Sequence, residues 1–131
     1  MTRVAPRPVL LYDTSCRLCR WTARLVAALD RSGELGLVGL EDDAADALLE
    51  RVIKEERLSS ARLVLPEGQL LSGGEVVLET LALLPATRPL ARVVEALHAE
   101  AAVARLYDLV ARNRGRLGRL VPDGPAPRRL L

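Results

Sequence analysis

The sequence predicts an α/β fold in which helices flank a central four-stranded mixed sheet, with an extra helical segment toward the C-terminus. Three observations predict this class. Short apolar runs typical of strands alternate with segments whose apolar residues recur at helical spacing. A turn sequence, Pro66-Glu67-Gly68, separates two short β-like segments. The pair Cys16 and Cys19 stands directly between the first expected strand and the first expected helix.

The first third of the chain predicts two parallel strands joined by a helix. Residues 8–12 (PVLLY) form a short apolar run, as expected of a buried strand. Residues 16–31 carry apolar side chains at helical spacing, and the helix N-cap types Thr14 and Ser15 precede them. Residues 35–40 form a second apolar run. A right-handed crossover through the helix would place the two strands parallel to each other.

The middle of the chain predicts a helix, a hairpin and another helix. An apolar stripe and an opposite charged face over residues 44–57 indicate an amphipathic helix. Residues 61–65 and 69–72 flank the turn and form the expected hairpin. Gly73-Gly74 then opens the segment GGEVVLETLALLP, in which Val77, Leu78, Leu81 and Leu84 can share one helical face, and Pro85 ends that helix.

The C-terminal third predicts helical structure followed by an irregular end. Residues 89–114 carry apolar stripes, with a break expected near residues 98–101. Glycine and proline are frequent beyond this region and favour irregular or disordered structure. We therefore expect residues 1–115 to form a single domain that includes the helical extension, and residues 116–131 to form an irregular or partly disordered tail.

The order of these elements is strand, helix, strand, helix, hairpin, helix, which is the thioredoxin-like layout. Periodicity alone leaves other α/β arrangements open. The position of the CxxC pair between the first strand and the first helix favours the thioredoxin-like one.

Composition excludes several classes of function. Aromatic residues make up 2% of the chain and Phe is absent, so stacking platforms for nucleic-acid bases are not expected. Charged residues interrupt every apolar run before it reaches the roughly 20 residues that span a bilayer. Two cysteines are too few for a secreted disulfide scaffold. The first residues, MTRVAPRPVLLYD, contain Pro and Arg where a signal peptide would need a continuous apolar stretch, so export is not expected. We expect a cytoplasmic protein without a membrane or nucleic-acid partner.

The segment DTSCRLC predicts thiol chemistry. Helix residues three apart are neighbours, so Cys16 and Cys19 can close a disulfide. Cys16 lies where the helix starts, and the free N–H groups there favour a thiolate, so it is the expected nucleophile. Cys19, one turn further along, is the expected resolving thiol. Asp13 is a candidate to relay a cysteine proton if burial favours its neutral form, whereas an ionised carboxylate close by would oppose thiolate formation.

The run DTSCRLC behind the strand PVLLY resembles the DCC family of predicted thiol-disulfide oxidoreductases, named for its Asp, Cys, Cys signature. The later segments SGGEVVLETLALLP and YDLVARNRGRL resemble the family in the same order. This resemblance implies a thioredoxin-like fold and carries the family's roles onto Asp13, Cys16 and Cys19. The chain departs from the family at Thr14, where Gly is common. It also has Ser59-Ser60-Ala61 where a thioredoxin has Pro, which argues against ordinary thioredoxin substrate docking.

These observations predict a thiol-disulfide oxidoreductase that exchanges a Cys16–Cys19 disulfide or dithiol with a protein or low-molecular-weight thiol. No metal or organic cofactor is required. The alternative is a non-catalytic thioredoxin-like binding module, with structural cysteines or a basic C-terminal interaction surface. Zinc binding would need four ligands, and His98 is the one further strong candidate, so dimerisation would be required.

The basic stretch near the C-terminus consists of Arg112, Arg114, Arg116 and Arg119. A solvated helix end is the expected structure, because cations favour the negative end of the helix dipole. Arg114, in the Asn-Arg pair, is the one functional candidate within it.

Overall fold

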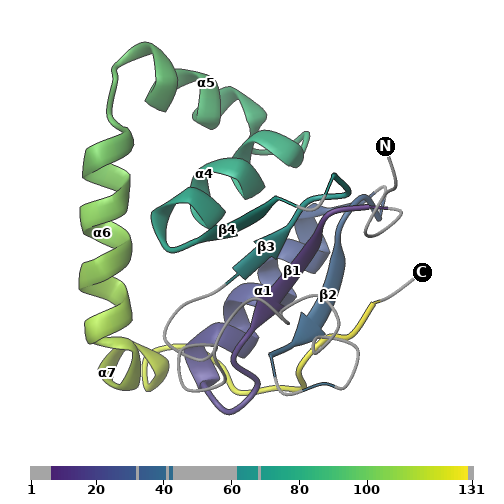
Figure 1. Ribbon diagram of the computed structural model, residues 1–131. Coiled ribbons are helices and arrows are strands. Elements are labelled where there is room, and N and C mark those ends of the chain that lie inside the picture. The colour runs from purple at the N-terminus through teal and green to yellow at the C-terminus, as the bar shows by residue number, and fades with distance from the viewer. Residues whose placement is uncertain (1–6, 32, 41, 43–61, 68, 130–131) are drawn as a thin grey trace.

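The computed structural model describes residues 7–31, 33–40, 42, 62–67 and 69–129. The helix expected over residues 44–57 lies outside the described residues, as does the segment Ser59-Ser60-Ala61. The elements that surround the cysteine pair are all described, and Figure 1 shows their arrangement.

Four strands form one mixed sheet in the order β2-β1-β3-β4 (Figure 1). They are β1 (Val9–Tyr12), β2 (Gly36–Gly39), β3 (Arg62–Val64) and β4 (Leu70–Ser72). Strand β1 pairs in parallel with β2 and antiparallel with β3, and β3 pairs antiparallel with β4. The register places Leu10 opposite both Leu37 and Leu63. The expected four-stranded mixed sheet and its hairpin are therefore confirmed.

Helices flank this sheet, as the sequence predicts. They are α1 (Arg17–Leu29), α4 (Gly74–Leu83), α5 (Arg88–Ala96), α6 (Glu100–Arg112) and the short α7 (Arg114–Gly118). The expected break in the long helical region lies between α5 and α6, where His98 has a φ of 51°. None of the helices described is both long enough and apolar enough to cross a membrane.

The core lies on both faces of the sheet, because the central strand β1 is buried throughout. Leu10 and Tyr12 point to one face and pack with Ala23 and Val26 of α1 and with Val76 of α4. The alternate residues of β1 pack on the other face, in a cluster made of Val9, Leu11, Val38, Leu40 and Val64. A strand buried on both faces reads as a continuous apolar run, and this explains the sequence PVLLY.

The C-terminal segment is irregular but bound to the rest of the fold. Helix α7 continues to Gly118, past the expected boundary at residue 115, and residues 119–129 then form no named helix or strand. Figure 1 shows this yellow segment passing α1 and reaching the edge of β2. There Arg129 forms an antiparallel bridge with Leu37, with two backbone hydrogen bonds of 2.8 Å. The chain end therefore contributes to the sheet edge.

Candidate functional site

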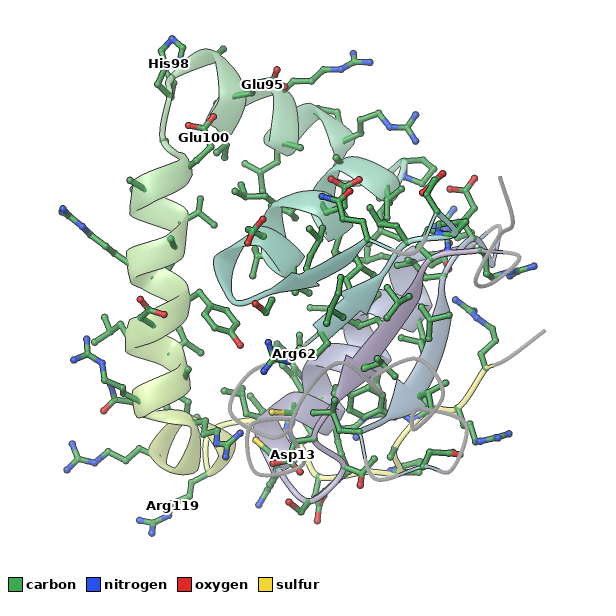
Figure 2. All side chains as sticks on the ribbon, viewed as in Figure 1. Asp13, Arg62, Glu95, His98, Glu100 and Arg119 are labelled. Carbon is green, nitrogen blue, oxygen red and sulfur yellow. The ribbon has the colours of Figure 1, made fainter. Side chains whose placement is uncertain are left out.

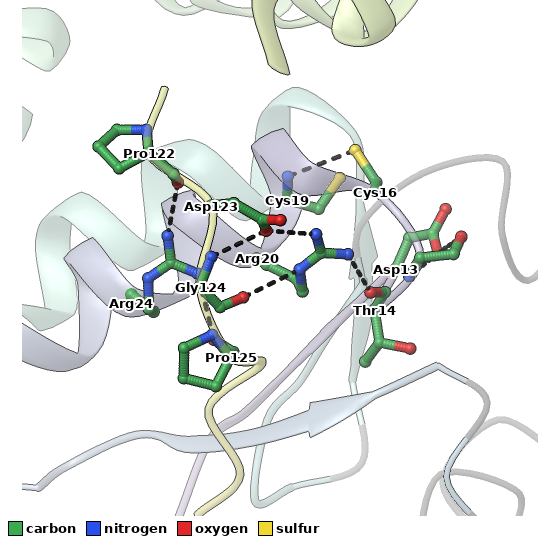
Figure 3. A network of polar contacts seen from close by, with 11 residues as sticks. Asp13, Thr14, Cys16, Cys19, Arg20, Arg24, Pro122, Asp123, Gly124 and Pro125 are labelled. Atoms are coloured by element: carbon green, nitrogen blue, oxygen red, sulfur yellow. Dashed lines mark hydrogen bonds and ion pairs between the residues drawn. The ribbon is translucent and has the colours of Figure 1, made fainter. Parts of the chain in front are cut away.

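Cys16 is the N-cap residue of helix α1. Its backbone is extended (φ −94°, ψ 118°), and its Sγ accepts a hydrogen bond from the backbone N–H of Cys19 at 3.3 Å (Figure 3). This sulfur therefore satisfies one of the free donors of the first turn, a place that favours a negative charge. The expected capping residues Thr14 and Ser15 do not fill this position.

Ser15 does not cap the helix because its side chain and backbone N–H are hydrogen-bonded to Asp13. The Oδ1 atom of Asp13 accepts hydrogen bonds from the Ser15 backbone N–H at 2.9 Å and from the Ser15 hydroxyl at 2.6 Å. Such local turns compete with helix capping, which explains why the helix begins one residue later. Asp13 is only 6% exposed and stands at the end of strand β1. The turn thus holds a buried carboxylate three residues before the nucleophile candidate.

Arg114 approaches the same carboxylate from helix α7. Its Nη1 lies 3.5 Å from Oδ2 of Asp13, and its side chain is 42% exposed. The partial exposure leaves the guanidinium in reach of a bound molecule as well as of Asp13. The sequence singled out Arg114 within the basic stretch, and the structure places it beside the DTSCRLC segment.

Cys19 lies one turn into α1 and packs against the core cluster on the α1 face of the sheet. Burial raises the pKa of its thiol to about 12, with further contributions from the hydrogen bond and charge of Cys16 and from the charge of Asp13. Arg114 acts in the opposite direction and lowers this pKa. Both cysteines are free thiols. At neutral pH Cys19 therefore stays protonated while it lies beside Cys16.

A cavity of about 350 Å³ opens beside Cys16. The strand end, the first turn of α1 and helix α7 supply its lining, which consists of Asp13, Ser15, Cys16, Arg17, Arg114, Gly115, Gly118 and Arg119. Cys19 is not among these residues. The two thiols therefore differ in their surroundings, because Cys16 lines the cavity whereas Cys19 packs against the core.

The contribution of α7 to this cavity is not apparent from the sequence. Arg119 is exposed, as expected of a solvated helix end, and it also contributes to the lining of the cavity beside Cys16. Close packing of α7 on α1 makes this possible, because a Cβ on Gly118 would lie 3.5 Å from the Cβ of Arg17. Gly118, which has no side chain to keep the two helices apart, was the one signal of such an approach in the sequence.

Arg20 has a different role from the cavity arginines. It donates hydrogen bonds to the carbonyls of Thr14 at 2.8 Å and Gly124 at 3.2 Å, and it pairs with Asp123 at 2.7 Å (Figure 3). The same pairing lowers the pKa of Asp123. Arg20 therefore fastens the C-terminal segment to the turn that carries the cysteines, and its charge is compensated there.

His98 lies far from the cysteine pair. Figure 2 shows it at the α5–α6 end of the molecule, opposite the end that carries Asp13 and Arg119. Within the residues that the structure describes, no three His, Cys, Asp or Glu side chains gather in a way that could hold a metal ion. The site consists of two thiols, one carboxylate and guanidinium groups.

Comparison with known protein families agrees with this geometry. The model of a family described as DCC1-like thiol-disulfide oxidoreductase matches residues 10–120. The match runs from strand β1 past helix α7, so it includes Asp13, both cysteines and Arg114. No curated protein and no solved structure matches the chain.

Proposed function

Because this chain belongs to the DCC1-like thiol-disulfide oxidoreductase family, we propose that it exchanges a Cys16–Cys19 dithiol or disulfide with the thiol or disulfide of a partner. The observation that carries the proposal is the position of Cys16. Its sulfur caps helix α1, accepts an N–H hydrogen bond and lines an open cavity. A thiol in such a place is open to a partner and lies at the N-terminal end of a helix, where backbone N–H groups point toward it.

Cys16 makes the first attack in this proposal. In the reducing direction its thiolate attacks one sulfur of the partner disulfide, and the partner's S–S bond breaks. A mixed disulfide forms at Cys16, and the released thiolate takes up a proton. The high pKa of Cys19 favours this order, because a thiol that stays protonated at neutral pH is a poor first nucleophile.

Cys19 then resolves the mixed disulfide. Its thiol loses a proton and attacks the Cys16 sulfur, which forms the Cys16–Cys19 disulfide and releases the second partner thiol. The cysteine pair has been oxidised, and the two electrons that it lost have reduced the partner disulfide to two thiols. We assign Asp13 the role of proton acceptor for Cys19, because its charge already acts on that thiol. We further propose a cytoplasmic partner, since a chain with two cysteines lacks the disulfide density of secreted scaffolds.

Alkylation rates as a function of pH test this assignment. We expect iodoacetamide to modify Cys16 in Cys19→Ser at least about a hundredfold faster at pH 7 than Cys19 in Cys16→Ser. The Cys19 rate should rise only in strongly alkaline solution, because burial raises its pKa and burial is retained when Cys16 is replaced. Mass spectrometry of the modified chain provides the measurement, and the same variants in denaturant provide the unshifted control.

A redox titration of the wild type completes the test. Equilibration in glutathione buffers should show one two-electron transition with a definite reduction potential. Two thiols that react alike, together with the absence of a reversible disulfide, would contradict the proposal and favour the non-catalytic binding module.

A further inference from the structure

The cavity beside Cys16 carries an excess of positive charge. Three arginines, Arg17, Arg114 and Arg119, contribute to its lining, against the single carboxylate of Asp13. That carboxylate already accepts hydrogen bonds from Ser15 and pairs with Arg114. In the described part of the chain no carboxylate lies within ion-pair distance of Arg17 or Arg119. Arg17 and Arg119 are therefore exposed cations at the cavity that form no close ion pair within the described residues, although the charge of Arg17 acts at longer range on Asp123.

The dimensions of the cavity suit a small molecule. Its volume of about 350 Å³ lies at the lower end of the range for small-ligand sites. Gly115 and Gly118 leave part of the wall without side chains, and a Cβ on Gly115 would meet no atom within 4 Å. A ligand with only a few heavy atoms around its sulfur can therefore enter.

We propose that the substrate of this site is an anionic low-molecular-weight disulfide, whose carboxylates bind Arg17, Arg114 and Arg119 while one of its sulfurs meets Cys16. This inference rests on the proposed exchange function. Guanidinium groups bind carboxylates with two parallel hydrogen bonds, which fixes the orientation of the ligand as well as its affinity. The same groups stabilise the negative charge on the departing thiolate.

The reaction balances with the two cysteines as the electron source. Attack by Cys16 breaks the ligand's S–S bond, forms the mixed disulfide and releases one carboxylate-bearing thiolate, which takes a proton from water. Attack by Cys19 on the Cys16 sulfur releases the second thiolate, and the Cys19 proton leaves through Asp13. One disulfide becomes two thiols and the cysteine pair is oxidised. A dithiol reductant, dithiothreitol in the assay, restores the pair.

A charge series of disulfides tests the proposal. Pre-reduced protein is mixed in single-turnover experiments with dithiodipropionate, a dianion, with neutral 2-hydroxyethyl disulfide and with dicationic cystamine. Each rate constant is divided by the rate constant of the same disulfide with free 2-mercaptoethanol. We expect the normalised rate constants to fall from the anion to the neutral compound to the cation. Added salt should reduce the ratio of anion to neutral compound, because it screens the arginines.

Variants connect this preference to the named residues. In Arg17→Gln/Arg119→Gln we expect the ratio of anion to neutral compound to fall about tenfold. The ratio cancels any change in the reactivity of Cys16 itself. Arg105→Gln removes an exposed arginine of helix α6 that does not line the cavity, and it should leave the wild-type ratio intact.

Three results would overturn the inference and each has a distinct meaning. Equal normalised rates across the charge series would reject the anionic substrate and leave the exchange function in place. Failure to reduce any disulfide would reject the exchange function together with its substrate. A disulfide-linked peptide dimer with an aspartate beside each cysteine, reduced faster than dithiodipropionate, would replace the small molecule with an acidic protein segment.

Discussion

Cys16 and Cys19 are three residues apart in sequence but stand in different surroundings. Cys16 caps the helix and lines the cavity, whereas Cys19 packs against the core and has a pKa of about 12. Burial is the main cause of that high pKa, and Asp13 adds to it through its charge. The resolving step therefore depends on removing a proton from a buried thiol.

The proposed role of Asp13 as proton acceptor predicts that its replacement slows the attack by Cys19. Asp13→Asn keeps an oxygen that accepts the Ser15 hydrogen bonds but removes the negative charge and the proton acceptor. We expect the second release of thionitrobenzoate from Ellman's reagent, which reports attack by Cys19, to slow by about 10- to 100-fold. The first release, which reports attack by Cys16, is followed in the same stopped-flow trace.

A faster second release in Asp13→Asn would be equally informative. If Asp13 acts on Cys19 only through its charge, Asp13→Asn lowers the pKa of Cys19 and the second release becomes faster. An acceleration would therefore remove Asp13 from the list of proton carriers. Asp108→Asn, which changes an exposed carboxylate on helix α6, controls for general effects of lost charge.

The sequence predicts site residues that are local, but it does not predict the tertiary contact that brings Arg114, already a candidate, and Arg119 to the same site. Asp13, Cys16 and Cys19 lie within seven consecutive residues, so one strand-to-helix junction brings them together. Arg114 and Arg119 reach the same cavity only because α7 packs on α1. No local pattern encodes that contact. The basic stretch therefore has the features of a solvated helix end until its partner helix is known.

At the scale of whole elements, close packing between α4 and α6 holds the helix that leads into α7. Gly74, the first residue of α4, approaches α6 so closely that an added Cβ would lie 2.7 Å from the Cα of Ala104. Helix α6 then leads through Asn113 directly into α7, which carries Arg114. A contact remote from the cysteines thus helps to position the cavity arginines.

Gly74→Ala tests this dependence. The added methyl group meets backbone rather than a flexible side chain, so α6 must shift, and we expect a loss of about 1–3 kcal/mol in the free energy of unfolding. Urea denaturation provides the measurement. Gly115→Ala is the matched control, because its Cβ meets no atom within 4 Å and alanine favours helix. Equal stability of the two variants would show that α4 and α6 do not depend on this close approach.

The strands and helices could largely be predicted because their patterns are local. The run PVLLY and the Pro-Glu-Gly turn predict β1 and the hairpin within a residue or two. The start of α1 was displaced, because the side chain of Ser15 bonds to Asp13 and leaves the N-cap to Cys16. A capping preference describes one residue, whereas the actual cap depends on what else that residue can bind.

At the scale of the whole molecule, the C-terminal segment connects elements that are distant in sequence. Arg20 and Arg24 on α1 donate hydrogen bonds to backbone carbonyls of the C-terminal segment. The hydroxyl of Tyr12 donates a hydrogen bond to the backbone carbonyl of Pro127 in the same segment. Asp30, which is 2% exposed, pairs with Arg129 and also accepts the backbone N–H groups of Glu34 and Leu35. Glycine and proline in this segment prevent regular structure, but they do not prevent specific binding to the fold.

Removal of residues 122–131 tests how much the fold depends on this segment. The deletion leaves the Asp30 carboxylate without its arginine and exposes the edge of β2, so we expect a loss of about 2–4 kcal/mol in the free energy of unfolding. Hydrogen exchange supplies a local readout. The amide of Leu37, which donates to the Arg129 carbonyl at 2.8 Å, should lose its protection, whereas the amide of Leu63 within the sheet should keep its rank among the slowest.

Arg128→Gln removes an exposed ion pair with Asp42 and should leave both measurements at their wild-type values. Unchanged protection of Leu37 in the deletion variant would mean that the bridge to Arg129 adds nothing to the sheet edge, and that α1 and the four strands hold the cysteine site without it.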